Sequence, residues 1–283
     1  MIHEDDPRPL IAGVCGFPIS QSKSPLLFRH WFDAYGVAGS YTPLRIAPED
    51  FTTVIPVLIK AGFRGLNCTL PHKIAALQIA DSVSDAARAI GAANTLVFSE
   101  DGQITADNSD WFGFIQNVRQ GCPDWNPSSG ASLMLGAGGA ARAGVYALLD
   151  AGCPEVRITN RTREKAEALA DFFGPNVKVI DWAERSDAVE GTSIIANSTS
   201  LGMVGGQPLT LHLNGSPKDA LVTDMVYNPL ETDLLSNARQ LGLRTVDGLG
   251  MLLHQARPGF RAWFGHDPEV TQALRDACLG TPK

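Results

Sequence analysis

The sequence predicts an α/β protein with two α/β domains around a cleft. Helix-like and strand-like patterns alternate along almost all of the 283 residues. At 121–130, proline, glycine, serine and asparagine interrupt that alternation, and a fresh alternating series follows. Because strands that alternate with helices form parallel sheets through right-handed crossovers, we expect one such unit on each side of this linker.

The first series carries clear boundary signals. Pro25 suits the first position of a helix and Gly36 its end, while Pro56 predicts a kink or an early new turn in the next helix. Asp101-Gly102 is a strong hairpin turn signal. Strands are expected at 9–16, 40–46, 65–70 and twice within 94–108, and helices at 24–36, 48–62, 71–83, 84–91 and 110–120.

The second series is more regular and contains no internal repeat. Short apolar runs typical of buried strands are separated by helix-length amphipathic segments. Strands are expected at 132–135, 155–160, 177–181, 193–197, 221–226 and 243–246, and helices at 139–151, 162–173 and 233–241.

Composition excludes several classes of protein. A formal charge of −7 and a pI near 5.3 argue against a nucleic-acid surface. No apolar run approaches the roughly 18 residues that span a bilayer, and residues 1–10 lack the pattern of a signal peptide. Five scattered cysteines without CxxC spacing predict reduced, buried thiols in a cytoplasmic protein and no metal site.

A glycine-rich turn opens the second series. Residues 136–141, Gly136-Ala137-Gly138-Gly139-Ala140-Ala141, match G-x-G-x-x-A between an apolar strand and a helix. The first glycine permits a tight turn, the second lets backbone approach a pyrophosphate, and the final alanine permits close helix–strand packing. This predicts that the C-terminal domain is Rossmann-like and binds a dinucleotide; the alternative is a tight turn without a ligand.

The next strand favours NADP over NAD. It ends at Asn160-Arg161-Thr162, where NAD-selective sites usually carry an acidic residue for the ribose 2′-hydroxyl. Arg161, with Arg163 or Lys165, could instead pair with a 2′-phosphate. Alternatively, Arg161 is an ordinary solvated residue at the start of a helix.

Polar side chains gather at predicted strand ends in the first series. Asn67 and Thr69 lie on one strand with Lys73 just after it, and Asn94 and Asp110 flank the hairpin. Taken singly, Asn94 could be a turn residue, Asp110 a helix cap and Lys73 a solvated lysine. Together, a lysine that donates a proton to a ketone oxygen and a carboxylate that orients it suit hydride transfer.

Nine ordered blocks resemble the shikimate dehydrogenase family: GFPISQSKSP, GLNCTLPHK, IGAANTL, ADNSDWFG, GAGGAAR, NRT, NSTSLGM, DMVYNP and DGLGMLLHQA. The resemblance implies reversible reduction of 3-dehydroshikimate to shikimate with NADPH, on the route through chorismate to aromatic amino acids. It implies a catalytic pair, Lys73 and Asp110. The implied substrate contacts are these two with Ser22, Ser24, Thr69, Asn94, Tyr227 and Gln255. The implied cofactor contacts are Asp85, Gly136, Ala137, Gly138, Gly139, Ala140, Asn160, Arg161, Thr162, Arg163, Glu164, Lys165, Met225 and Gly248.

The resemblance also implies a discontinuous first domain. Substrate binding is expected over 1–116 with 250–283, and NADP binding over 117–249. The partner is then a small molecule, with no nucleic acid and no membrane, and the protein a monomer or homodimer. In an extended segment, Ser22 and Ser24 would point to one side and could grip both oxygens of a carboxylate.

Two positions depart from the family pattern. Gln21 and Phe28 stand where the family commonly has histidine, and a changed cleft rim is expected. This leaves open a quinate/shikimate dehydrogenase using NAD or NADP. A rival of another class is a non-catalytic NADP-binding regulatory protein, and a methylene-tetrahydrofolate-type dehydrogenase is a rival by fold analogy alone.

Overall fold

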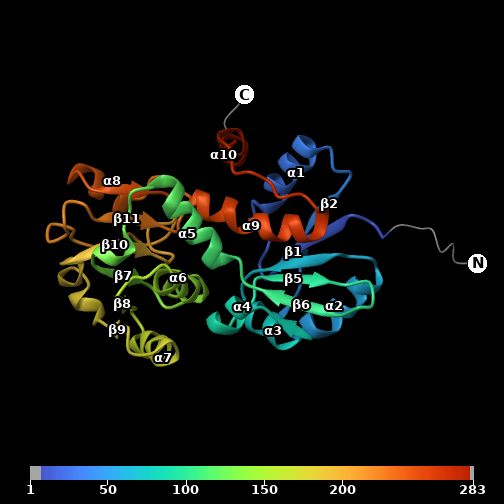
Figure 1. The fold of residues 1–283 in the computed structure, drawn as a ribbon, viewed down its shortest axis with the longest axis horizontal. Coiled ribbons are helices and arrows are strands. Elements are labelled where there is room, and N and C mark those ends of the chain that lie inside the picture. The colour runs from blue at the N-terminus through green and yellow to red at the C-terminus, as the bar shows by residue number, and fades with distance from the viewer. Residues whose placement is uncertain (1–7, 281–283) are drawn as a thin grey trace, which may run out of the picture. The chain divides into compact units, whose positions relative to one another are not determined.

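Two six-stranded sheets organise the computed structural model, which describes residues 8–280 (Figure 1). Each sheet belongs to its own compact unit. One unit holds the described residues up to Ser109 and those from Gln255 onward, and the other holds Asp110–His254. The predicted α/β class is confirmed. Residues 1–10, where we expected no signal peptide, lie mostly outside the described residues.

The sheet of the first unit has the strand order β2-β1-β3-β5-β6-β4. Strand β1 pairs in parallel with β2 and β3. The predicted hairpin, β5 and β6, is antiparallel, and β5 is also antiparallel to β3, so that the sheet is mixed. The strands are β1 (Ile11–Gly16), β2 (Ser40–Arg45), β3 (Gly65–Cys68), β4 (Ser82–Val83), β5 (Thr95–Phe98) and β6 (Ile104–Asp107).

The helices of this part of the chain start and end close to the predicted positions. Gly36 ends the first helix in the left-handed region, and Pro56 lies inside an unbroken helix. The helices are α1 (Ser24–Tyr35), α2 (Phe51–Lys60), α3 (Lys73–Gln78), α4 (Asp85–Ile90), α9 (Leu249–Phe264), which runs across the unit boundary, and α10 (Gln272–Leu279), with a 3-10 turn, Pro48–Asp50, before α2.

The helix predicted over 71–83 was wrong in its second half. Helix α3 ends at Gln78, and β4 pairs in parallel with β6 at the edge of the sheet. Two hydrogen bonds fix this edge: Asp81 N donates to Ile104 O at 2.9 Å, and Ile104 N donates to Asp81 Oδ2 at 2.8 Å. Pairing between distant segments therefore overrides a local helical pattern.

The sheet of the second unit is wholly parallel, with the order β12-β11-β10-β7-β8-β9. Strand order reverses between β7 and β10, and ligands of such sheets bind at the carboxyl ends of strands near that point. The strands are β7 (Ala131–Leu135), β8 (Val156–Thr159), β9 (Val177–Val179), β10 (Thr192–Asn197), β11 (Leu221–Asp224) and β12 (Arg244–Val246). The helices are α5 (Asp110–Gly121), α6 (Gly139–Asp150), α7 (Arg163–Phe173) and α8 (Asp233–Gln240), with 3-10 turns at Pro127–Ser129, Trp182–Glu184 and Asp187–Val189.

Apolar side chains cover both faces of this sheet. Met134 packs with residues of α5 and α6, whereas its neighbours Leu133 and Leu135 pack with residues of α8. Successive residues of a strand point to opposite faces, so a strand covered on both sides is a continuous apolar run. That is why the short run in β7 was recognisable as a buried strand.

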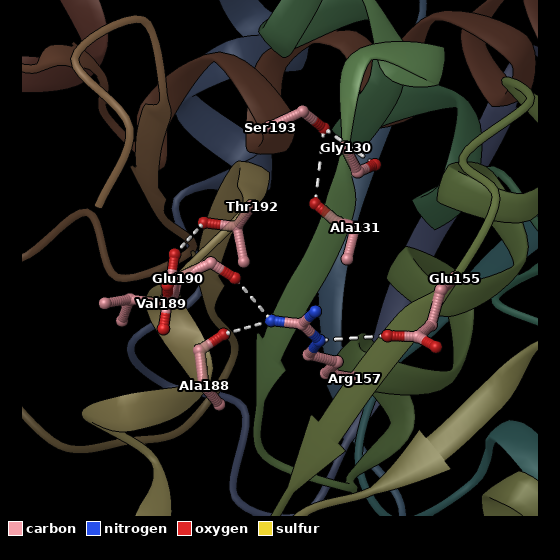
Figure 2. Close-up of polar contacts among 9 residues, drawn as sticks. All are labelled: Gly130, Ala131, Glu155, Arg157, Ala188, Val189, Glu190, Thr192 and Ser193. Atoms are coloured by element: carbon pink, nitrogen blue, oxygen red, sulfur yellow. Dashed lines mark hydrogen bonds and ion pairs between the residues drawn. The ribbon is translucent and has the colours of Figure 1, made fainter. Parts of the chain in front are cut away.

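A half-buried arginine fixes the chain that leads into β10. Arg157 of β8 donates to the carbonyls of Ala188 at 3.0 Å and Glu190 at 2.6 Å, and its Nε pairs with Glu155 at 2.9 Å (Figure 2). The following strand is held in turn by Thr192, which donates to Val189 O at 2.7 Å. These contacts fix the start of β10, the strand that leads to Ser198–Ser200.

Candidate active site

The glycine-rich turn follows β7 and has the geometry that a dinucleotide turn requires. Gly136 has a φ of +107°, and a Cβ there would lie 2.6 Å from Ser198 Oγ. A side chain at this position would therefore be both strained and obstructed. Gly138 caps α6, and apart from its chain neighbours no atom lies within 4 Å of where its Cβ would be. Open space before a helix N-terminus suits a pyrophosphate.

A hollow of about 290 Å³ opens beside this turn, within the second unit. Arg161 and Lys165 bring positive charge to its wall, and Trp182 contributes an aromatic ring. The wall comprises Gly136, Ala137, Gly138, Asn160, Arg161, Thr162, Lys165, Trp182, Ser198, Thr199 and Ser200. Seven predicted cofactor residues are thus brought together around one hollow of suitable charge for a phosphorylated dinucleotide.

Arg163 is engaged elsewhere. Its Nε pairs with Glu167 Oε1 at 2.8 Å, and its Nη1 pairs with Asp181. These carboxylates raise the pKa of Arg163 above its ordinary value. By contrast, Arg161 donates one long hydrogen bond, 3.3 Å, to the neutral amide of Gln207. Gly139, Ala140, Arg163 and Glu164 are not among the wall residues, and their cofactor roles stay predictions.

Sequence reasoning missed four wall residues. Ser198, Thr199 and Ser200 follow β10 directly, and the carboxyl end of the strand beside β7 is where a ligand is expected. That rule applied to the block NSTSLGM could have found them. Trp182 follows a short strand in an irregular segment, and we see no sequence signal that would have singled it out.

Met225 and Gly248 lie beside each other in the second unit. A Cβ on Gly248 would lie 2.6 Å from the backbone of residues 224–226, so that only glycine allows this approach. Asp224 anchors the segment, because it is buried and accepts hydrogen bonds from Asn197 Nδ2 at 2.9 Å and Thr232 Oγ1 at 2.7 Å. Burial raises the pKa of Asp224 and, two residues beyond Met225, that of Tyr227.

In the first unit, a buried amide holds several predicted substrate residues. Asn94 Oδ1 accepts from Ser109 N at 2.7 Å, and Asn94 Nδ2 donates to Gln255 Oε1 at 3.3 Å. The backbone of the preceding residue, Ala93, donates to Lys73 O at 2.9 Å. Asn94, Gln255 and the start of α3 are therefore brought together, although they are distant in sequence.

The proposed catalytic pair lies at the start of two helices. Lys73 is the first residue of α3 and is half-buried; Asp110 is the first residue of α5 and is buried. Asp110 follows Ser109 directly. Thr69, a predicted substrate contact, lies just beyond β3, where its N donates to Cys15 O at 2.9 Å. Lys73 belongs to the first unit and Asp110 to the second, and their pairing stays a prediction.

The serine segment is a turn, so the predicted extended geometry was wrong. Ser22 N donates to Ile19 O at 3.1 Å, and Ser24 N donates to Ser22 Oγ at 3.3 Å. Lys23 has helical backbone angles and its Nζ donates to Cys278 O at 3.0 Å. Ser22 rather than Ser24 thus accepts a backbone hydrogen bond at the start of α1.

Three further positions singled out in the sequence lie in different surroundings. Asp85 is exposed and pairs with Arg88 at 3.1 Å on α4, so its cofactor role stays a prediction. Phe28 is fully buried and its ring stacks on Tyr41, with centroids 3.6 Å apart. The expectation that Phe28 changes the rim of a cleft therefore has no support, because its side chain lies in the core of the first unit. Gln21 is exposed.

Within 8–280, no helix is long and apolar enough to cross a membrane. In the same part of the chain, no three His, Cys, Asp or Glu side chains form a group that could hold a metal ion.

The second unit combines a parallel sheet whose strand order reverses between β7 and β10, a glycine turn and a cationic hollow. These features define a Rossmann-like dinucleotide-binding protein, to which the first unit adds a second α/β unit. The family model described as shikimate dehydrogenase substrate binding domain matches residues 14–96. Those for shikimate / quinate 5-dehydrogenase and the shikimate 5′-dehydrogenase C-terminal domain match 125–204 and 248–279. The chain belongs to the shikimate dehydrogenase family, as the resemblance predicted.

Relatives and solved structures agree with this. The shikimate dehydrogenase (NADP(+)) of Ruegeria sp. strain TM1040 is 52% identical, over 95% of this chain and 98% of its own. The structure of quinate dehydrogenase from Corynebacterium glutamicum in complex with NAD superposes with a TM-score of 0.89 at 31% identity, covering 96% of this chain and 99% of that one. Shikimate 5-dehydrogenase from Thermus thermophilus with NADP(H) and shikimate gives 0.85 at 33%, with the same coverage.

Proposed function

We propose that the chain is an NADP-dependent shikimate dehydrogenase, an oxidoreductase that reversibly reduces 3-dehydroshikimate to shikimate in chorismate and aromatic amino acid biosynthesis. The observation that carries the proposal is the hollow beside the glycine turn, with Arg161 and Lys165 in its wall, in a chain of this family. The names of the Ruegeria and Thermus relatives, which mention NADP and shikimate, support it.

The residues present fit this cofactor. The backbone of Gly136–Gly138 would hold the pyrophosphate, and Arg161 with Lys165 would hold the 2′-phosphate. When bound, NADPH supplies the hydride. Gly138, with open space before it, permits the close approach that the pyrophosphate needs.

The remaining chemistry belongs to side chains of the protein. Lys73 would donate a proton from its ammonium group to the C3 oxygen of the ketone as negative charge develops on that oxygen. Asp110 would accept hydrogen bonds from substrate hydroxyls and keep Lys73 placed and protonated. We propose Ser22 and Ser24 for the acid group of the substrate, with Thr69, Asn94, Tyr227 and Gln255 as its other contacts.

The decisive experiment compares four pairs: shikimate or quinate with NADP or NAD, followed by the absorbance of the reduced cofactor. We expect the highest kcat/KM for shikimate with NADP. Lys73→Ala should lower kcat by about 10² or more, the usual size of a general acid–base contribution. Lys60→Ala, at the exposed end of α2, is the matched control and should leave kcat unchanged. Near-normal turnover by Lys73→Ala would contradict the assignment.

The likeness to the NAD complex of quinate dehydrogenase favours a second candidate, a quinate/shikimate dehydrogenase using NAD. Arg161 argues against it, because a cation in the hollow favours a 2′-phosphate over a bare hydroxyl. Quinate turnover with NAD that equals shikimate turnover with NADP would select this candidate. NADPH binding without any turnover would instead select the non-catalytic regulator.

We also propose that the protein acts in the cytoplasm as a monomer or homodimer. All five cysteines are free and buried, which is typical of a reducing compartment. The domain bounds stay a proposal: substrate binding over 1–116 with 250–283, and NADP binding over 117–249. Sedimentation would decide between one copy and two.

A further inference from the structure

An aromatic residue stands in the wall of the hollow, where the other wall residues are small, polar or basic. Trp182 is the first residue of the 3-10 turn after β9, and it is half-buried. Part of its side chain packs against the apolar cluster that includes Leu133 and Leu135 of β7. An indole that is anchored on one side and left half-exposed in a polar wall suits a site for a planar ligand.

Arg185 holds the Trp182 ring in one place. Its guanidinium carbon lies over the indole, 4.7 Å from the ring centre. The same guanidinium donates to Trp182 O and, at 2.9 Å, to Thr210 O. Because Arg185 covers the ring and is itself tied to two carbonyls, the indole is positioned before any ligand binds, which lowers the entropy lost on binding.

The order of the strands indicates which part of a dinucleotide would meet Trp182. The glycine turn follows β7, Arg161 follows β8 and Trp182 follows β9, and these three strands are neighbours in this order. Met225 and Gly248, two other predicted cofactor residues, follow β11 and β12 on the opposite side of β7. One half of the dinucleotide would therefore extend over β8 and β9, and the other half over β10 and β11.

The 2′-phosphate identifies the half that extends over β8 and β9. Arg161 and Lys165, the cations proposed for this phosphate, lie at the end of β8 and the start of α7. In NADP the 2′-phosphate is on the adenosine ribose, and the adenine is attached to the neighbouring ribose carbon. The adenine therefore belongs on the side of the hollow that holds Trp182.

We propose that Trp182 binds the adenine of the cofactor by stacking, an inference that rests on the proposed function for the identity of the cofactor. A nucleobase offers a flat π-face, and stacking on an aromatic ring requires no hydrogen bond from the base. Arg161 and Lys165 bind the phosphate that only NADP carries, whereas Trp182 binds the base that NADP and NAD share. Trp182 thus contributes affinity for both cofactors and does not choose between them.

The test measures binding rather than turnover. The ligand is 2′,5′-ADP, which carries the adenine and the 2′-phosphate but no nicotinamide, and its Kd is measured by titration calorimetry. We expect Trp182→Ala to raise this Kd about tenfold, a usual result of removing one aromatic ring that stacks on a base. Trp182→Phe keeps an aromatic ring and should stay within about threefold of the wild type. Phe172→Ala, which removes an exposed aromatic side chain of α7 outside the wall, is the matched control.

Two further measurements separate stacking from a general loss of structure. Trp182→Ala should raise the KM for NADP and for NAD by the same factor and leave the KM for shikimate within about twofold. In the wild type, 2′,5′-ADP should quench part of the tryptophan fluorescence, and that part should be missing in Trp182→Phe. The fluorescence measurement needs only these two proteins, so it decides the question if Trp182→Ala does not fold.

The outcomes distinguish this inference from the proposed function. An unchanged Kd in Trp182→Ala, an equal loss in Phe172→Ala, a KM that rises with NADP alone, or no quenching in the wild type would overturn the inference, even in a chain that oxidises shikimate with NADP. Conversely, a chain that binds 2′,5′-ADP through Trp182 but has no turnover with shikimate would contradict the proposed function and support the stacking role.

Discussion

Removing Arg161 should weaken the preference for NADP over NAD without harming the chemistry. Arg161 lies in the wall of the hollow and donates only a long, neutral hydrogen bond to Gln207, so its charge remains available for a phosphate. Hydrogen bonds to a charged group contribute about 1.5–3 kcal/mol, and Lys165 in the same wall retains part of the attraction. We therefore expect Arg161→Ala to cost about 2 kcal/mol with NADP, which is roughly 30-fold in kcat/KM.

The measurement is kcat/KM for NADP and for NAD at saturating shikimate. With NAD, which has no 2′-phosphate, Arg161→Ala should change kcat/KM by less than about twofold. Arg163→Ala should cost little with either cofactor, because Glu167 and Asp181 already occupy its guanidinium. An equal loss with NADP and NAD in Arg161→Ala would refute the reasoning. Arg239→Ala, an exposed arginine paired with Glu231 on α8, is the control.

Three further predictions concern the first unit. Gly65→Ala should destabilise the fold by about 3 kcal/mol, because its Cβ would overlap Trp263 Nε1; an unchanged Tm would contradict this. Burial lowers the pKa of His72 below its ordinary 6.5, so the unfolded chain takes up the proton first and stability falls as pH drops through about 6.5. His72→Gln should flatten that decline in Tm, and an identical pH profile would count against it. Lys23→Met should lose the hydrogen bond to Cys278 O and about 1 kcal/mol in urea unfolding, whereas an unaltered midpoint would show that the contact contributes nothing.

Local signals predicted most of the fold. Pro25, Gly36 and the Asp101-Gly102 turn act through their own backbone preferences, and the structure has a boundary at each. Pro56 did not break α2, because Pro56 and Thr52, whose carbonyl loses its partner, are both exposed to water. By contrast, β4 depends on pairing with a distant strand, and no pattern within 71–83 could show it.

In the candidate site, too, features formed by contiguous residues were predictable, and those formed by contacts between distant residues were not. The glycine turn was predictable because strand, turn and helix are contiguous in sequence. The link from Tyr41 through Asn67 to Asn94 was not, since the Asn67 side chain joins residues of separate elements by hydrogen bonds. The extended geometry predicted for Ser22 failed for a related reason: Lys23 adopts helical angles while its side chain holds α10, a contact invisible to local reading.

The first unit is assembled from two stretches of chain that are synthesised at different times. Trp31 packs against Phe260 with ring centroids 5.2 Å apart, and Trp263 Nε1 donates to Leu96 O at 3.1 Å. All of Asp110–His254 must leave the ribosome before Phe260 and Trp263 do. The second unit can therefore complete its core first. Until then, the earlier strands of the first unit leave their aromatic residues exposed. Such a nascent chain should be most vulnerable to aggregation just before Phe260 emerges.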